Sequence, residues 1–260
     1  MSTKNCLFFV KKLSLCRYYH FENFFFVVFG IENWIILAFI WALVPLANTF
    51  YFSQVPLSTL TEKNEGTKKL LSSKILWLFV LLMICSGASE QAMSQWASAF
   101  AESGLQVSKT VGDLAGPCMF AALMGASRAI YSRCSEKINL RIFMICSCFL
   151  SVAGYLLASM SPHPALALAG CGLCGLAAGI LWPGTYSLSA AHFPGGGTAM
   201  FAILALAGDL GCSLGPTVVG FVSDSARIGG DLKTGLLAAT FFPVALIAGL
   251  VFYKRHKTII

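Results

Sequence analysis

The chain has 260 residues, of which 57% are hydrophobic and only 11% are charged. Soluble proteins carry about 25% charged residues, so this composition excludes a water-soluble globular domain and indicates that lipid is the main solvent. The formal net charge of +7 does not indicate a nucleic-acid partner, because the basic residues fall mostly between apolar runs, where they set membrane orientation.

The chain reads as a series of apolar runs, each close to the roughly 20 residues that cross a bilayer. Residues 1–23 form an irregular segment with no signal-peptide cleavage site, and the first full span is residues 24–50. Residues 51–74 are polar and rich in lysine, so we expect a cytoplasmic loop. Six further spans are predicted at residues 75–101, 110–133, 140–160, 165–191, 198–223 and 234–253.

Glycines occur at spacings of three to five residues in the spans at 165–191 and 198–223. Small residues at such spacings let a neighbouring helix come close. Both spans contain an internal proline, which a helix in lipid tolerates when neighbours re-satisfy the freed carbonyl group. The residues that we expect at helix–helix contacts are Gly179, Gly184, Gly211, Gly215, Pro216 and Gly220.

Metal and cofactor chemistry has little support in the sequence. The chain contains ten cysteines, most of them inside apolar runs, where cysteine behaves as a small hydrophobic residue. Cys171 and Cys174 have the spacing of a metal-binding pair, but no second pair or histidine partner accompanies them. We therefore expect no metal and no cofactor.

Orientation follows from the short loops, since lysine and arginine favour the cytoplasmic side. The loop that follows residue 133 is basic, as is the tail at residues 254–260, and we place both in the cytoplasm. The loops at residues 102–109, 161–164 and 224–233 hold few or balanced charges and are expected outside. These assignments predict a multi-pass protein of the cell membrane with a cytoplasmic carboxyl terminus.

One span, a polar loop and six further spans together resemble the carboxyl-terminal half of a major facilitator superfamily permease, a family with two six-helix halves. The stretch Gly211-x-x-x-Gly215-Pro216 is similar to that family's Gly-x-x-x-Gly-Pro pattern, and Gly179-Ile-Leu-Trp-Pro-Gly184 is typical of its helix 10 in sugar permeases. The usual loop motif after helix 8 is degenerate here, since Arg128 falls one place early. The resemblance implies an all-α polytopic membrane protein, a six-helix bundle preceded by one transmembrane helix that is similar to helix 6.

The function implied by the resemblance is secondary active transport of a small polar solute, sugar-like and driven by protons. Charges inside a membrane are functional candidates by default, and Glu90 and Asp209 fall near the middle of their spans with no Lys or Arg expected beside them. Aromatic rings stack on sugars. Candidate residues along the substrate path are Glu90, Gln91, Ser94, Gln95, Trp182, Tyr186 and Asp209.

Each candidate also has a structural interpretation, which is an interhelical hydrogen bond for the polar residues and core packing for the aromatic ones. Asp113 stands in Thr110-x-x-Asp113, a capping pattern that indicates a helix start. Protease and hydrolase motifs such as His-Glu-x-x-His and Gly-x-Ser-x-Gly are absent from the sequence, so an enzyme is not expected.

Alternating access needs two bundles around one site, and the sequence accounts for one of them. Three interpretations stay open, namely a truncated gene product, a chain that pairs with a separately encoded amino-terminal half, and a homodimer. The expected partners are the lipid bilayer, a small-molecule substrate and protons. The alternative function is that of a non-transporting membrane subunit or a non-functional remnant.

Overall fold

The computed structural model describes residues 34–54, 70–106, 114–134, 138–225 and 230–257, which are helical apart from short connections and contain no strand. Contacts divide the chain into two units, Met1–Lys63 and Asn64–Ile260. In the first unit, helix α2 (Trp34–Ser53) covers the later part of the span predicted at residues 24–50. Pro45 lies inside α2, and its carbonyl oxygen accepts a hydrogen bond of 2.8 Å from Thr49 Oγ1.

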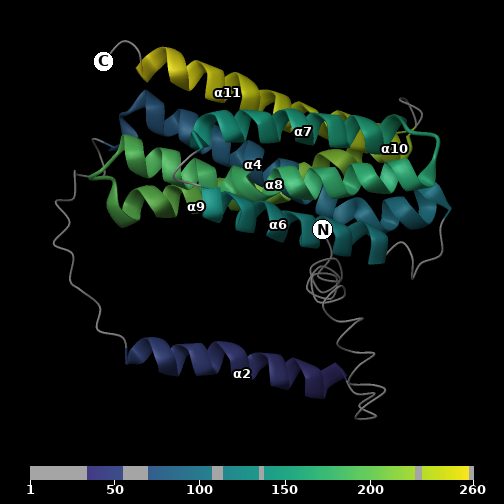
Figure 1. Cartoon of the computed structure of the whole chain (residues 1–260), viewed down its shortest axis with the longest axis horizontal. Coiled ribbons are helices and arrows are strands. Elements are labelled where there is room, and N and C mark those ends of the chain that lie inside the picture. The colour runs from purple at the N-terminus through teal and green to yellow at the C-terminus, as the bar shows by residue number, and fades with distance from the viewer. Residues whose placement is uncertain (1–33, 55–69, 107–113, 135–137, 226–229, 258–260) are drawn as a thin grey trace. The chain divides into compact units, whose positions relative to one another are not determined.

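The second unit is a bundle of helices that pack side by side (Figure 1). Helix α4 (Lys74–Ala99) continues into the π-helical turn η1 (Phe100–Gly104), and the π-helical turn η2 (Leu114–Cys118) precedes α6 (Met119–Cys134). Three long helices follow, α7 (Leu140–Met160), α8 (Pro164–His192) and α9 (Gly197–Ser223), and then the shorter α10 (Leu232–Ala239) and α11 (Phe241–Lys257).

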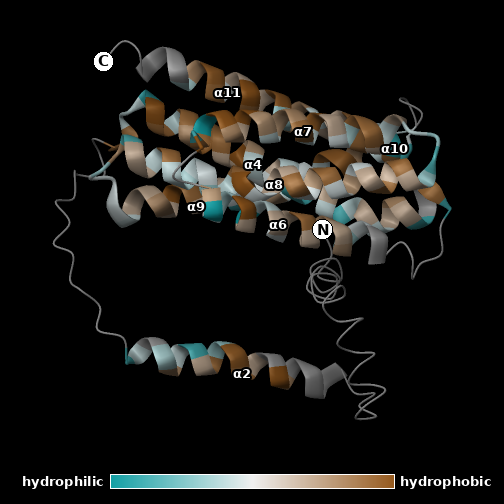
Figure 2. Ribbon diagram, viewed as in Figure 1, coloured by the Kyte–Doolittle hydropathy of each residue, from teal (hydrophilic) through white to brown (hydrophobic). Residues whose placement is uncertain are grey.

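Within the described residues, five helical segments are long and apolar enough to cross a membrane: Lys74–Glu102, Leu140–Met160, Pro164–His192, Gly197–Ser223 and Leu232–Tyr253. The span predicted at residues 110–133 corresponds to η2 and α6, which are not among the five. α6 itself has only 16 residues, fewer than the roughly 20 that cross a bilayer, and Arg128 and Arg133 make it less apolar than the other long helices. These segments confirm an all-helical membrane architecture, and Figure 2 shows mostly hydrophobic residues along α7 and α11.

The last predicted span, residues 234–253, is not one continuous helix. It breaks at Thr240 between α10 and α11. Pro243 explains the break, because proline has no amide hydrogen to donate to the carbonyl of Ala239 and its ring clashes with that carbonyl. The sequence analysis missed this interruption because the run is uniformly apolar on both sides of it.

Local signals set several helix ends. The Asn139 side chain accepts hydrogen bonds from the amides of Arg141 and Ile142 at 3.1 and 3.3 Å, which caps the start of α7. Pro164 occupies the first turn of α8, where a missing amide hydrogen costs nothing. Asp231 caps α10 through the Thr234 amide at 2.7 Å.

Backbone contacts at glycine hold the bundle together, with α4 packing most extensively on α9 and α8 packing on both α7 and α6. A Cβ atom on Gly215 would stand 2.8 Å from Ala88 Cα, and one on Gly211 would stand 2.8 Å from the carbonyl carbon of Ile84. No side chain fits at such distances, so glycine is what permits α9 to approach α4 this closely.

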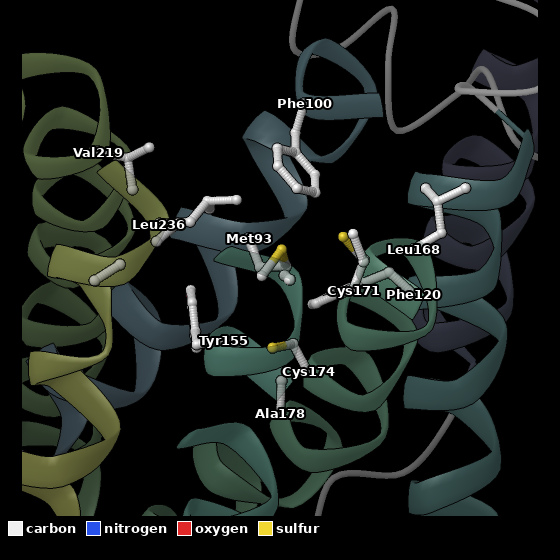
Figure 3. Close-up of a cluster of buried hydrophobic side chains, with 14 of the residues drawn as sticks. Met93, Phe100, Phe120, Tyr155, Leu168, Cys171, Cys174, Ala178, Val219 and Leu236 are labelled. Atoms are coloured by element: carbon white, nitrogen blue, oxygen red, sulfur yellow. The ribbon is translucent and has the colours of Figure 1, made fainter. Parts of the chain in front are cut away.

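The buried core runs through the bundle, and Figure 3 shows part of it around Met93, Tyr155 and Cys174. Among the described residues, buried side-chain nitrogen and oxygen atoms have hydrogen-bond partners, as expected where water is excluded, with the exception of Thr240 Oγ1. The Tyr155 hydroxyl donates a 2.8 Å hydrogen bond to the Ser89 carbonyl and so links α7 to α4. Large apolar side chains on the exposed surface of α7 and α11 face outward, including Phe149, Leu156, Phe241 and Phe252, as lipid requires.

Candidate solute-binding face

Six residues from four helices lie near one another at about the middle of the bundle: Glu90 on α4, Arg128 on α6, Trp182 and Tyr186 on α8, and Asp209 and Cys212 on α9. We call this set the polar band. Arg128 and Asp209 are exposed and the other four are partly exposed. The band therefore forms part of one open face rather than part of the core.

Glu90 lies near the middle of the membrane-spanning segment Lys74–Glu102. Its helix meets α8 one turn earlier, where the Ser86 hydroxyl lies 3.4 Å from the Leu181 carbonyl oxygen and 3.5 Å from Thr185 Oγ1. Because α4 and α8 run antiparallel, Glu90 lies level with the residues just before Leu181, close to the middle of α8.

Arg128 reaches that same depth from α6. Its Nε donates a 3.0 Å hydrogen bond to the carbonyl oxygen of Gly179, near the centre of α8 (Pro164–His192). Pro183 stands four residues after Gly179 and has no amide hydrogen, so this carbonyl has no partner inside its own helix. The Arg128 guanidinium supplies the missing donor.

The positive charge of Arg128 acts on the Glu90 carboxyl, although no ion pair within 4.0 Å joins the two side chains. We expected no Lys or Arg to pair with Glu90, and none in the described part of the chain forms an ion pair with it, but Arg128 lies close enough for its charge to act on the carboxyl. The sequence analysis assigned Arg128 to a degenerate loop motif, whereas the structure places it within α6 and against α8. Two signals pointed to it: an arginine inside the span predicted at residues 110–133, and a proline four residues after Gly179.

Trp182 and Tyr186 stand one turn apart on α8, with ring centroids 6.4 Å from each other. The Trp182 ring lies directly against α9, because a Cβ on Gly208 would stand 2.6 Å from indole Cζ2. Tyr186 also contacts Phe201 of α9, with ring centroids 5.6 Å apart. The aromatic pair is thus held between α8 and α9, next to Asp209.

Asp209 and Cys212 complete the band on α9. Asp209 lies close enough to interact electrostatically with the Tyr186 hydroxyl. The Cys212 thiol likewise lies within electrostatic range of the carboxylates of both Asp209 and Glu90. The two predicted acidic residues therefore belong to one neighbourhood although they come from helices far apart in sequence. Cys212 itself was not among the predicted site residues.

The other predicted residues of α4 lie beside the band. Gln91, Ser94 and Gln95 are partly exposed, and Gln95 Nε2 donates to Gln91 Oε1 at 3.5 Å, the upper limit for a hydrogen bond. They share a half-exposed strip with Glu90, while Ala92 and Met93 are fully buried. Asp113, the predicted capping residue, lies outside the described residues.

The glycines expected at helix contacts surround the band. A Cβ on Gly179 would stand 2.7 Å from the Met124 carbonyl oxygen of α6, and one on Gly184 would stand 2.6 Å from Met144 Sδ of α7. Gly220 lies under the ring of Trp96, whose Nε1 donates a 3.0 Å hydrogen bond to the Pro216 carbonyl oxygen. These contacts hold the four helices of the band in fixed register.

The band combines hydrogen-bonding groups, charge and aromatic surface at mid-membrane depth. In the described part of the chain, no cluster of three His, Cys, Asp or Glu residues could hold a metal ion. Such an arrangement suits binding of a polar solute, because aromatic faces cover apolar ring surfaces while carboxylates and amides bind hydroxyl groups.

The family model of the Major Facilitator Superfamily matches residues 23–216. Since this match covers most of the chain, the protein belongs to the Major Facilitator Superfamily. It is therefore a multi-pass membrane protein of a transporter family, whose members are transporters rather than enzymes. The match does not assign the chain to either half of the two-bundle architecture. Neither a curated protein nor a solved structure matches the chain significantly.

Proposed function

We propose that the bundle formed by α4 to α11 is the wall of a translocation path for a small polar solute, and that the polar band is its binding surface. The observation that carries the proposal is that Glu90, Asp209, Trp182 and Tyr186 come from three helices to one neighbourhood in the middle part of the bundle. Polar side chains at this depth are costly in lipid and are kept where they serve substrate or ions.

The solute class follows from the chemistry of the band. Trp182 and Tyr186 offer two adjacent rings to one face of a sugar-like molecule. Asp209 beside them, together with Gln91 and Gln95 on α4, offers acceptors and donors for hydroxyl groups. A hydroxylated ring therefore fits better than a purely apolar solute or a bare ion.

Proton coupling is part of the same proposal. Glu90 is a titratable group within the membrane-spanning part of α4; the charge of Arg128 acts on it, and Cys212 lies close to both Glu90 and Asp209. Uptake or release of a proton at Glu90 would change the charge of the band, and this change is what links solute movement to a proton gradient in a symporter.

The path needs a second wall, because alternating access works by movement of one bundle against another. We propose that a second six-helix bundle covers the polar band, supplied by a separately encoded half or by a second copy of the chain. In this arrangement the protein is a permease of the cell membrane, with the loop that follows α6 and the carboxyl terminus in the cytoplasm.

Cysteine labelling tests whether the face is lined by water. Ser213 and Leu214 are neighbours on α9 and both are exposed, but Ser213 lies one turn from Asp209 whereas Leu214 continues the apolar stripe of Leu206 and Leu210. In a chain with exposed Cys146 replaced by serine, a membrane-impermeant thiol reagent should label Ser213→Cys well above the parent chain and leave Leu214→Cys unlabelled. Equal labelling of both would overturn a water-lined face.

Uptake tests the function itself. Cells that express the full chain, alone and together with a candidate amino-terminal half, are offered radiolabelled hexoses and hexuronates, and at least one should accumulate above the empty-vector level where the second bundle is supplied. Asp209→Asn and Trp182→Ala should abolish this uptake, while Leu214→Ala should not. A chain with an unlabelled Ser213→Cys and no uptake of any probe would favour the alternative of a non-transporting membrane subunit.

A further inference from the structure

Arg128 has more donors than its structural contact uses. Nε is engaged by the Gly179 carbonyl at 3.0 Å, and Nη2 makes only a weak contact of 3.9 Å with Met124 Sδ. A guanidinium carries five N–H donors in a planar fork, so its terminal edge still has donors for a ligand. Because Nε is fixed, this edge is held in place before any ligand arrives, which lowers the entropic cost of binding.

The surface beside Arg128 is open. Gly125, one turn before it, would meet no atom within 4 Å if it carried a Cβ. Ala129 beside it and Ser132 one turn later are small and exposed as well. Met124 touches Nη2 from one side, but the small residues at the other three positions leave the rest of the α6 surface beside the guanidinium open, so a solute on this face can reach it.

The charge around Arg128 limits what this solute can be. The polar band holds one guanidinium and two carboxylates, Glu90 and Asp209, with the partly exposed Cys212 and Tyr186 as its other titratable groups. An anion that binds Arg128 has to compete with Glu90, because the Glu90 carboxyl already interacts electrostatically with the Arg128 guanidinium. A group with one negative charge meets less repulsion from the two acidic residues than a phosphate dianion would.

We propose that the transported solute carries a single carboxylate, which binds end-on to the terminal nitrogens of Arg128 while the rest of the molecule lies on Trp182 and Tyr186. Planar carboxylates match the guanidinium fork in two parallel hydrogen bonds. This inference rests on the proposed function and narrows its substrate class to hydroxylated acids. Glu90 then acts as the nearby negative charge with which the solute carboxylate competes for Arg128.

The test uses the full chain in lipid nanodiscs with three probes: D-glucuronate, D-glucose and glucose 6-phosphate. Binding is followed by ligand-induced thermal stabilisation and by quenching of tryptophan fluorescence. D-glucuronate should bind at least about tenfold more tightly than either of the other two, as expected when one charge-assisted fork is gained. Arg128→Gln should remove this preference, and Arg128→Lys should retain only part of it.

Matched variants separate binding from folding. Arg133→Gln removes an exposed arginine from the same helix and should leave glucuronate binding unchanged. Since Arg128→Gln also leaves the Gly179 carbonyl unpaired, the double variant Arg128→Gln with Pro183→Ala restores an amide hydrogen to that carbonyl. The double variant should be folded and should still lack the glucuronate preference. Glu90→Gln removes the competing carboxylate and should bind glucuronate more tightly.

The outcomes distinguish the two proposals. Equal binding of D-glucose and D-glucuronate, unaffected by Arg128→Gln, would overturn the carboxylate inference and leave the proposed solute path standing. A preference for glucose 6-phosphate would overturn the single-charge argument. Binding of none of the three probes, with no change in tryptophan fluorescence, would count against both proposals.

Discussion

Trp96 on α4 and Pro216 on α9 are joined by a hydrogen bond of 3.0 Å from the indole Nε1 to the proline carbonyl oxygen. The same ring covers Gly220, where a Cβ would stand 3.0 Å from indole Cζ2. The Trp96 side chain thus links α4 to α9 by a hydrogen bond and by packing, in addition to the close contacts at the glycines of α9.

Replacement of Trp96 by phenylalanine should keep most of the packing and remove the hydrogen bond. We expect a loss of about 1 kcal/mol in unfolding free energy, the usual net value of one such bond, measured by thermal or denaturant unfolding in detergent. Trp77 on the same helix is the control, because its Nε1 also donates a 3.0 Å hydrogen bond, to the Leu71 carbonyl oxygen, but at a largely exposed site and within one stretch of chain, so Trp77→Phe should cost less. Equal losses from the two variants would contradict a specific tie between Trp96 and Pro216.

Gly215→Leu should disrupt the contact between α9 and α4. The Cβ position of Gly215 lies 2.8 Å from Ala88 Cα, so a leucine forces two backbones apart, and overpacking of this kind costs about 1–3 kcal/mol or more. Gly125→Leu is the matched control, because that position is exposed and has no atom within 4 Å. Purified yield and melting temperature in detergent should fall for Gly215→Leu alone; wild-type values for it would show that α9 tolerates separation from α4.

Glu90→Gln keeps the shape of the side chain and removes its titratable group. If Glu90 couples solute movement to protons, the variant, once assembled with a second bundle, should still bind solute but lose accumulation that depends on the pH gradient. The measurement is uptake with an imposed pH gradient, with exchange of solute across the membrane at equal pH as the control for binding. Robust gradient-driven uptake by Glu90→Gln would exclude this residue as the coupling group.

Topology can be tested by reporter fusions. Fusions after Lys69, Lys137 and Lys257 should report the cytoplasm, and fusions after Ser103 and Gly229 should report the outside, because lysine and arginine concentrate in the former loops. Paired reporters that are active only in the cytoplasm or only outside give the answer. An outside signal at Lys137 would refute the arrangement of the six spans.

Asp231 should make stability depend on pH. Hydrogen bonds from the Thr234 hydroxyl and amide, both 2.7 Å, hold the pKa of Asp231 below its ordinary value of 3.8. A lowered folded-state pKa means that the stabilisation is complete above the unfolded pKa and is lost as pH falls through the folded one. Asp231→Ala should therefore cost about 1 kcal/mol at pH 7, as for other N-caps.

The same substitution should cost progressively less below about pH 4, where the unfolded carboxyl begins to take up its proton. Unfolding of wild type and Asp231→Ala in acid-stable detergent at several pH values measures this difference. Asp231→Asn, which keeps a capping oxygen, should retain most of the neutral-pH stability and lose the pH dependence. A constant difference between wild type and Asp231→Ala from pH 7 to pH 3 would contradict the assignment.

The sequence alone predicted the helical membrane architecture, because the length and apolar composition of each segment are local properties, and these determine whether the segment can cross a bilayer. α7 occupies the predicted residues 140–160, and α8 and α9 differ from their predicted bounds by a residue or two. The spacing of Gly211 and Gly215 likewise indicated a close helix contact, but not that α4 would be the neighbour. The break at Thr240 was missed although Pro243 was visible, since the run is apolar on both sides of it and a helix in lipid tolerates an internal proline.

The candidate site shows where sequence reasoning ends. Glu90 and Asp209 were visible as charges inside apolar runs. They became candidates because the transfer of a charged side chain from water into lipid costs free energy. Only the tertiary structure showed that Arg128 belongs to the polar band, because its position along the bundle depends on the helix against which α6 packs. The carbonyl that Pro183 leaves unpaired on α8 and the donor on α6 that satisfies it are 51 residues apart in the chain, and only the packing of the two helices brings them together.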